Sequence, residues 1–197
     1  GQGGEYLVTL TAINKKNAFV SVNHFEASDR TPPFKVILGQ VMSKGDRMDY
    51  AIQKATELGV GTIQLLTSDR CEMRLKYERD QKKLEHWQSV AIAACEQCGM
   101  NRIPKIIPPI HVNDWVISEL PNSRFVLAPN KDQKNVLLDS SDNIALLIGP
   151  EGGLSEAEID FANQNHFQNW CIGDRILRTE TAPVVALSIL NYHFSSK

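Results

Sequence analysis

The sequence predicts an α/β fold in which helices cover both faces of a parallel sheet, with a small β element in front. Short, continuously apolar runs alternate with longer segments of helical periodicity, which is the pattern of strands buried on both faces. Within residues 1–30, two runs instead alternate apolar and polar side chains with a period of two, as the strands of a β-hairpin do. A chain of 197 residues fits one medium domain, or one domain plus a small appendage.

The small β element comes first along the chain. We expect strands at residues 5–10 and 18–24, because both alternate with period two and the turn-prone residues 14–17 separate them. Residues 26–33 end in two prolines and are expected to form a linker. The chain opens on Gly1 without an initiating Met or a signal peptide, so we expect that further sequence precedes it.

The second part of the chain alternates strands and helices. Residues 47–58 place apolar side chains on one helical stripe that Gly59 closes, and residues 78–98 do the same before Gly99. Residues 183–194 begin with Pro183, which suits a first helical turn. Residues 184–190 within them are apolar all round, which indicates a buried helix. In chain order we expect strand 36–40, helix 47–58, strand 62–66, helix 78–98, helix 114–120, strands 124–128 and 144–148, helix 155–165, strand 170–172 and helix 183–194.

Cysteine usage and hydropathy limit the class of protein. Cys95 and Cys98 form a CxxC, but no second ligand pair at a suitable spacing exists for zinc, and both lie in an apolar helical pattern. We expect buried, reduced thiols, no metal site and a cytoplasmic location. Since no apolar run approaches the ~20 residues of a membrane helix, we expect no membrane partner.

The net charge of −2 conceals an asymmetry along the chain. Residues 1–110 carry 15 Lys and Arg against 12 Asp and Glu, whereas residues 111–197 carry 6 against 11. The basic excess gathers in residues 70–105. It indicates either a surface that faces a polyanion or a solvated helix face, because acidic residues are interspersed.

A glycine-rich turn follows the apolar strand 144–148. It reads Gly149-Pro150-Glu151-Gly152-Gly153 and leads into a helix that Ser155 and Glu158 cap. A strand, a glycine loop and a helix N-terminus form the usual ligand site of parallel α/β proteins. The spacing is neither a P-loop nor GxGxxG, and Glu151 would repel a polyphosphate. A nucleoside that carries an amine or a sulfonium suits it better, and a purely structural turn is the alternative.

A second loop, residues 171–183, crowds polar side chains between a glycine and the last helix. It holds Arg175, Arg178 and Glu180, which are either functional groups or partners in turn ion pairs.

These two segments make the sequence recognisable. Residues 148–159 and 172–187 closely resemble the RsmE family of the SPOUT, or trefoil-knotted, methyltransferases. The resemblance extends to residues 39–45, 53–60, 68–71 and 93–99, so that it covers nearly all of 34–197. The hairpin is similar to the end of the family's PUA-like RNA-binding β-barrel. We therefore expect two domains, residues 1–30 as the C-terminal part of that barrel with its front missing, and residues 34–197 as a SPOUT methyltransferase domain.

The resemblance implies methyl transfer from S-adenosyl-L-methionine to N3 of a uridine in 16S ribosomal RNA of the small ribosomal subunit. It further implies a C-terminal trefoil knot and a homodimer. Three loops are expected to hold the cofactor, through Leu127, Pro129, Ile148, Gly149, Pro150, Glu151, Gly152, Gly153, Ile172, Gly173, Ile176, Leu177, Thr181 and Ala182.

Uridine N3 carries a proton that must leave before or during attack. The histidines lie outside the motifs, so Arg178 is the candidate for stabilising negative charge on the uracil. Glu180 is the candidate proton acceptor or cofactor-positioning group. Phosphate contacts are expected from Lys44, Arg47, Lys54, Arg70, Arg74, Arg102 and Lys105.

Two other functions stay open at this point. A SPOUT methyltransferase that acts on another RNA, such as tRNA, would have similar cofactor loops. A non-catalytic RNA-binding assembly factor would not need Gly149, Gly152, Gly153, Arg178, Glu180 and Thr181 together. A nucleotide-dependent oxidoreductase is disfavoured because GxGxxG is missing.

Overall fold

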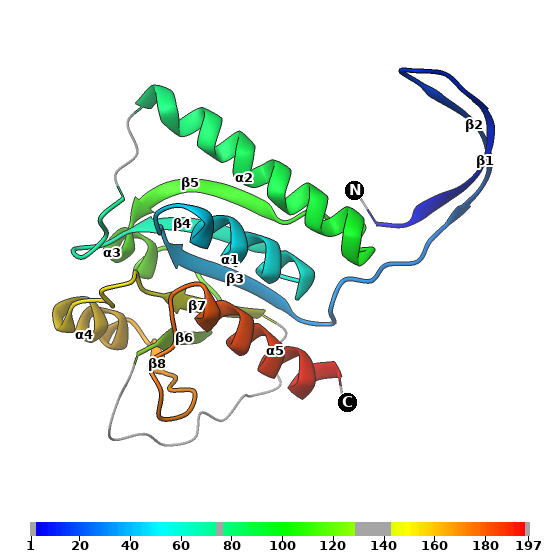
Figure 1. Ribbon diagram of the computed structural model, residues 1–197. Coiled ribbons are helices and arrows are strands. Elements are labelled where there is room, and N and C mark those ends of the chain that lie inside the picture. The colour runs from blue at the N-terminus through cyan, green and yellow to red at the C-terminus, as the bar shows by residue number, and fades with distance from the viewer. Residues whose placement is uncertain (1–2, 74–76, 129–142, 196–197) are drawn as a thin grey trace.

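A computed structural model describes residues 3–73, 77–128 and 143–195 of the chain (Figure 1). Within these ranges, six strands form one parallel sheet in the order β5-β4-β3-β7-β6-β8. The strands are β3 (Lys35–Val41), β4 (Thr62–Thr67), β5 (Lys105–His111), β6 (Ser123–Leu127), β7 (Asn143–Ile148) and β8 (Gln168–Asn169). The expected parallel α/β sheet is confirmed.

Helices cover both faces of this sheet, as predicted. They are α1 (Asp46–Glu57), α2 (Tyr77–Cys98), α3 (Val112–Val116), α4 (Glu156–Gln164) and α5 (Thr181–Ser195). Alternate side chains of β7 enter two different cores. Ile144, Leu146 and Ile148 pack with α1, α2 and α5, whereas Ala145 and Leu147 pack with α3 and α4. The domain therefore has three layers, with helices on both faces of the sheet. Ligand sites in such folds lie at the carboxyl ends of the strands.

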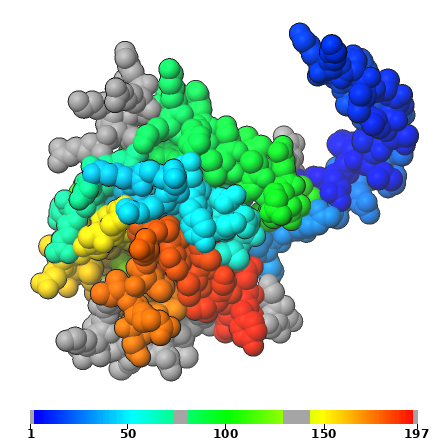
Figure 2. Space-filling model, in the orientation of Figure 1, coloured from blue at the N-terminus to red at the C-terminus, as the bar shows by residue number. Residues whose placement is uncertain are grey.

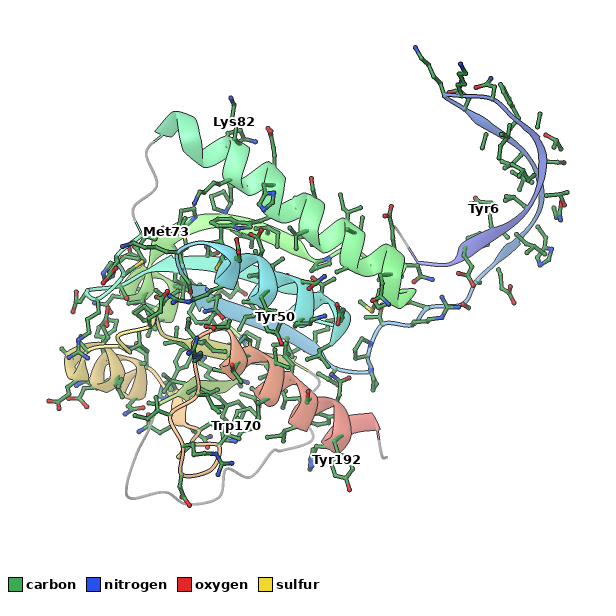
Figure 3. All side chains as sticks on the ribbon, in the orientation of Figure 1. Tyr6, Tyr50, Met73, Lys82, Trp170 and Tyr192 are labelled. Atoms are coloured by element: carbon green, nitrogen blue, oxygen red, sulfur yellow. The ribbon has the colours of Figure 1, made fainter. Side chains whose placement is uncertain are left out.

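The first strands form a separate antiparallel hairpin, β1 (Glu5–Ile13) and β2 (Ala18–Glu26), as the alternation predicts. It extends away from the α/β domain (Figures 1 and 2). Every residue of both strands is exposed, including the labelled Tyr6 in Figure 3. Ile13, for example, is 71% exposed. The hairpin thus has an exposed apolar surface that no other described residues cover.

Charged groups fasten the base of the hairpin to the loop after α2. Arg30 donates to the carbonyl oxygen of Gly99 at 2.8 Å and pairs with Glu5 at 3.2 Å. Arg102 donates from Nε to Asp29 at 2.6 Å. Since all four charged side chains are partly exposed, the anchor depends on their ionisation more than on burial.

The Asp29 contact leads to a prediction about pH. Hydrogen bonds from Thr31 and from Arg102 lower the pKa of Asp29 from 3.8 to about 2. Because the folded-state pKa is the lower one, the contact contributes fully above pH 3.8 and is lost as the pH falls towards 2. An NMR titration of the Asp29 carboxyl carbon should therefore give a midpoint near 2 in the native chain. It should move towards the ordinary value in Arg102→Ala, and an ordinary midpoint in the native chain would contradict the account.

Two element predictions need correction. The strand expected at 170–172 is wrong, because the structure places β8 at Gln168–Asn169. The Trp170 amide still donates to Val126 O at 2.8 Å, but the Trp170 ring then packs on Phe125 and the chain leaves the sheet. The helix expected at 114–120 is α3, which begins and ends earlier.

One strand, β5, has no counterpart among the predictions. It contains Pro108 and Pro109, whose missing amide donors argue against a central strand. The structure resolves the conflict by placing β5 at the edge of the sheet, beside β4. The other strands and helices agree with the prediction to within a few residues at each end.

In the described ranges, no helix has both the length and the apolar character that crossing a bilayer requires.

Candidate functional site

The glycine turn after β7 is built as its sequence predicts. The Ser155 hydroxyl accepts from the Glu158 amide at 3.2 Å, and the Glu158 carboxylate accepts from the Ser155 amide at 2.8 Å, which completes a capping box. Gly153 has a φ of 69°, and its amide donates to Pro150 O at 2.9 Å. These contacts hold the turn tightly at the carboxyl end of β7.

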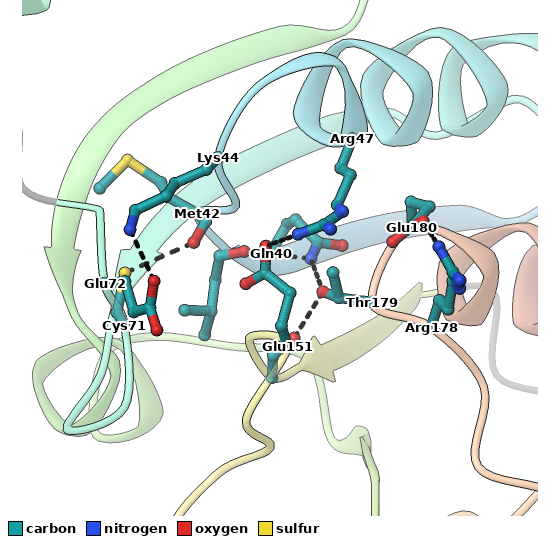
Figure 4. Close-up of polar contacts among 12 residues, drawn as sticks. Gln40, Met42, Lys44, Arg47, Cys71, Glu72, Glu151, Arg178, Thr179 and Glu180 are labelled. Atoms are coloured by element: carbon teal, nitrogen blue, oxygen red, sulfur yellow. Dashed lines mark hydrogen bonds and ion pairs between the residues drawn. The ribbon is translucent and has the colours of Figure 1, made fainter.

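The second loop lies against the first. The amides of Thr181 and Ala182 both donate to Arg178 O at 2.9 Å where α5 begins. The Thr179 hydroxyl donates to Gly149 O at 2.7 Å (Figure 4). Two segments that are separated in sequence therefore form one wall of a site.

A cavity of about 720 Å³ opens between these loops and the end of β6. Most of the predicted cofactor residues line it: Leu127, Ile148, Gly149, Pro150, Glu151, Gly152, Gly153, Ile176, Leu177 and Ala182. Both proposed catalytic residues, Arg178 and Glu180, line it as well. Ile172, Gly173 and Thr181 are not among the lining residues, and Pro129 lies outside the described residues. The cavity is also lined by residues that were not singled out as cofactor or catalytic residues: Ala128, Leu154, Glu156, Ile159 and Thr179.

Opposite charges meet at the mouth of the cavity. Arg47 donates to Glu151 at 2.8 Å, and Arg178 lies 3.9 Å from Glu180 (Figure 4). The Arg178 side chain is 79% exposed, whereas that of Glu180 is 15% exposed. The Arg178–Glu180 ion pair expected as an alternative is thus present but long, which leaves the guanidinium available to a ligand.

A second cavity, of about 460 Å³, adjoins the first. Lys44, Arg47 and Arg70, three of the predicted phosphate contacts, line it, and Arg47 and Arg70 line both cavities. Each cation is already engaged by the protein. Lys44 donates to Glu72 at 2.6 Å, a contact that raises the pKa of Lys44 and lowers that of Glu72. Arg70 donates to Gly152 O at 3.1 Å.

The other predicted phosphate contacts lie elsewhere. Lys54 pairs with Glu57 on α1 at 2.7 Å, Arg102 holds Asp29 beside the hairpin, and Lys105 is exposed at the start of β5. Arg74 lies outside the described residues. Of the six predicted residues that the structure describes, three therefore lie at the cavities.

Asp69, His111 and Glu158 place their ligand atoms within 4.8 Å of one another. Internal hydrogen bonds already use these groups. Glu158 accepts from the amides of Asp69 at 2.9 Å and Ser155 at 2.8 Å, and His111 Nδ1 accepts from the Asn113 amide at 3.2 Å. The group therefore ties the loop after β4 to the start of α4, a role that needs no metal ion.

Cys95 and Cys98, the CxxC residues, lie in the last turn of α2. Cys95 is buried, and burial raises the pKa of its thiol. Cys95 and Cys98 form no disulfide with each other. A buried thiol with a raised pKa is a poor nucleophile, which agrees with the structural role expected for Cys95.

Comparison with known proteins decides the family. A family model described as an RNA methyltransferase domain matches residues 30–191. The ribosomal RNA small subunit methyltransferase E of Buchnera aphidicola (subsp. Schizaphis graminum) is 40% identical over 187 residues, which are 94% of this chain and 76% of that protein. The chain belongs to the ribosomal RNA small subunit methyltransferase E family.

Solved structures of similar fold include a member of the methyltransferase E family. The enzyme from Neisseria gonorrhoeae, bound to S-adenosyl methionine, is 34% identical with a TM-score of 0.90, covering 98% of this chain and 81% of that chain. A protein from Legionella pneumophila with bound cofactor SAM is 35% identical with a TM-score of 0.91, covering 98% and 80%. The resemblance that the two glycine segments indicate is thus confirmed.

Proposed function

We propose that this chain transfers a methyl group from S-adenosyl-L-methionine to N3 of a uridine in 16S ribosomal RNA of the small ribosomal subunit. Membership of the methyltransferase E family supports the reaction type and the class of RNA. The observation that carries the proposal is the cavity in which both glycine segments, Arg178 and Glu180 meet.

The cavity has the chemistry that such a cofactor requires. Its volume of about 720 Å³ lies in the range of small-molecule sites. Leu127, Ile148 and Leu177 offer apolar contact for an adenine ring, and Glu151 and Glu180 offer negative charge for an amine and a sulfonium. A Cβ built on Gly153 would meet nothing within 4 Å, so the backbone there is open to a ligand.

Bound S-adenosylmethionine supplies an electrophilic methyl group. The residues of this chain then have two tasks, which are to hold the uracil in line with that methyl group and to manage the N3 proton. We assign charge stabilisation on the uracil to the exposed Arg178 guanidinium. Glu180, which is mostly buried beside it, acts as the proton acceptor or positions the cofactor. In the first of these roles Glu180 takes up the N3 proton, which is lost before or during the attack of N3 on the methyl group.

The smaller cavity suits the RNA backbone. Lys44, Arg47 and Arg70 lie next to the proposed cofactor site, where a phosphate flanking the target uridine would compete with Glu72 for Lys44 and with Glu151 for Arg47. Lys54, Arg102 and Lys105, which do not line the cavities, complete the proposed RNA contacts together with Arg74.

Further features complete the proposal. The hairpin, residues 1–30, is assigned to a PUA-like RNA-binding β-barrel, which its exposed apolar side chains support. Residues 34–197 are assigned to a SPOUT domain with a C-terminal trefoil knot. A homodimer is proposed because α5 is largely apolar yet exposes Tyr192 (80%), labelled in Figure 3. A cytoplasmic location follows from an RNA substrate within the ribosome.

Two measurements test this function. Calorimetry should detect binding of S-adenosylmethionine to the purified chain. Labelled methyl groups should then pass to small ribosomal subunits taken from a strain that lacks the activity, and not to total tRNA. Gly153→Val is the matched negative control, since a β-branched residue is strained at a φ of 69°. Transfer to tRNA instead would favour the alternative substrate, and absence of both binding and transfer would favour a non-catalytic assembly factor.

A further inference from the structure

Gln40 is a polar residue in an apolar row. Val36, Leu38 and Gln40 share one face of β3, and Val36 and Leu38 are both buried in the core with α1 and α5. Gln40 is only 1% exposed. A buried amide destabilises a fold unless hydrogen bonds satisfy it, so its presence here requires a reason.

The Gln40 side chain makes one contact of long range. Its Nε2 donates to Val41 O at 3.1 Å and to the Thr179 hydroxyl at 3.2 Å (Figure 4). No described residue donates a hydrogen bond to its buried Oε1. The amide is thus held by its donor side alone, at some cost in stability.

Thr179 links Gln40 to the glycine turn through hydrogen bonds to both. Its hydroxyl has a single hydrogen, which it donates to Gly149 O at 2.7 Å. Because Gln40 occupies an acceptor lone pair of the same oxygen, the hydroxyl hydrogen is directed at Gly149. In the sheet, Gln40 also lies opposite Ile148, the residue that precedes the turn.

We propose that Gln40 is a positioning residue for the cofactor site. Through the Thr179 hydroxyl it fixes the loop before α5 against the Gly149–Gly153 turn, so that the wall of the larger cavity that these two segments form is set before a ligand enters. Gln40 does not line the cavity, whereas Thr179 and Gly149 do. The proposal rests on the proposed function, since it takes this cavity as the S-adenosylmethionine site.

The test compares Gln40→Met, Thr179→Val and the double variant by calorimetry with S-adenosylmethionine and by thermal unfolding of the free protein. Methionine removes both the donor and the buried Oε1, so the unfolding midpoint should stay or rise. The cofactor Kd should nevertheless increase about five- to tenfold, the effect of one lost hydrogen bond that organises the site. The double variant should bind no more weakly than Thr179→Val alone.

Gln64→Met is the matched control. Gln64 is 6% exposed on the neighbouring β4 and donates to Leu65 O and Pro108 O, away from both loops. It should alter stability without altering the cofactor Kd. An unchanged Kd in Gln40→Met, an equal loss in Gln64→Met, or additive effects in the double variant would each overturn the proposal.

Amide hydrogen exchange separates this proposal from the proposed function. In the free protein, Gln40→Met should accelerate exchange at Gly153 and Thr181, whose amides donate to Pro150 O and Arg178 O. If the native chain binds no S-adenosylmethionine, the assignment of the larger cavity as its binding site is wrong. Unchanged exchange at both amides would overturn the positioning role itself.

Discussion

Arg178→Ala should lower kcat for RNA methylation by about 10²- to 10³-fold, the usual effect of removing one group that stabilises developing negative charge. The guanidinium lines the larger cavity and is 79% exposed, with Glu180 3.9 Å away. We propose that it faces the uracil there. Its carbonyl oxygen, which accepts from Thr181 and Ala182, is unaffected by the substitution. The cofactor Kd should accordingly change little.

The matched control is Arg175→Ala. Arg175 is also exposed and lies on the same loop, but it does not line the cavity. Single-turnover methylation rates with saturating cofactor should fall for Arg178→Ala and not for Arg175→Ala. Equal rates in Arg178→Ala and the native chain would remove Arg178 from the reaction.

Gly39→Ala should destabilise the domain more than Gly61→Ala does, although each substitution adds a single methyl group. Gly39 is buried in β3, and a Cβ there would lie 2.5 Å from the Trp115 ring, which is itself 3% exposed. The ring cannot move without disturbing the core that α3 shares with β7. Overpacking of this kind costs about 1–3 kcal/mol. Chemical denaturation should report this as a lower midpoint with an unchanged slope.

Gly61→Ala provides the control for this stability effect. A Cβ at Gly61 would lie 3.6 Å from Val36 O, an ordinary van der Waals distance, and would meet no other atom within 4 Å. Its midpoint should stay near that of the native chain. A loss as large in Gly61→Ala as in Gly39→Ala would mean that the Trp115 contact does not determine the cost.

The sequence predicts most of this fold because its periodicities are strong. Strands such as β7 are continuous apolar runs, and α1 carries a single apolar stripe that Gly59 ends. β5 is not predicted because Pro108 and Pro109 argue against a strand. The prolines are tolerated since β5 lies at the edge of the sheet, and the order of strands cannot be read from the local sequence. The bounds of β8 are mispredicted because this strand has only two residues. The apolar Trp170 that follows it suggests a strand but packs into the core instead.

The site divides in a similar way. The local sequence alone is enough to predict Gly149–Gly153 and Arg178 as site residues, and the structure places them around one cavity. Gln40 could be found only as a polar residue on an inward strand face, and its partner Thr179 lies 139 residues away in the sequence. Charge counting likewise cannot tell a cation that faces a cavity, such as Arg47, from one such as Arg102 that fastens the hairpin.

The central claim is that this site methylates N3 of a uridine in the small-subunit ribosomal RNA. Small subunits from a strain that lacks the modification should be incubated with the purified chain and S-adenosylmethionine, and the RNA digested to nucleosides. Mass spectrometry against synthetic standards should identify 3-methyluridine as the new product with the native chain, and far less of it with Arg178→Ala. A different methylated nucleoside, or 3-methyluridine formed equally well without Arg178, would contradict the account.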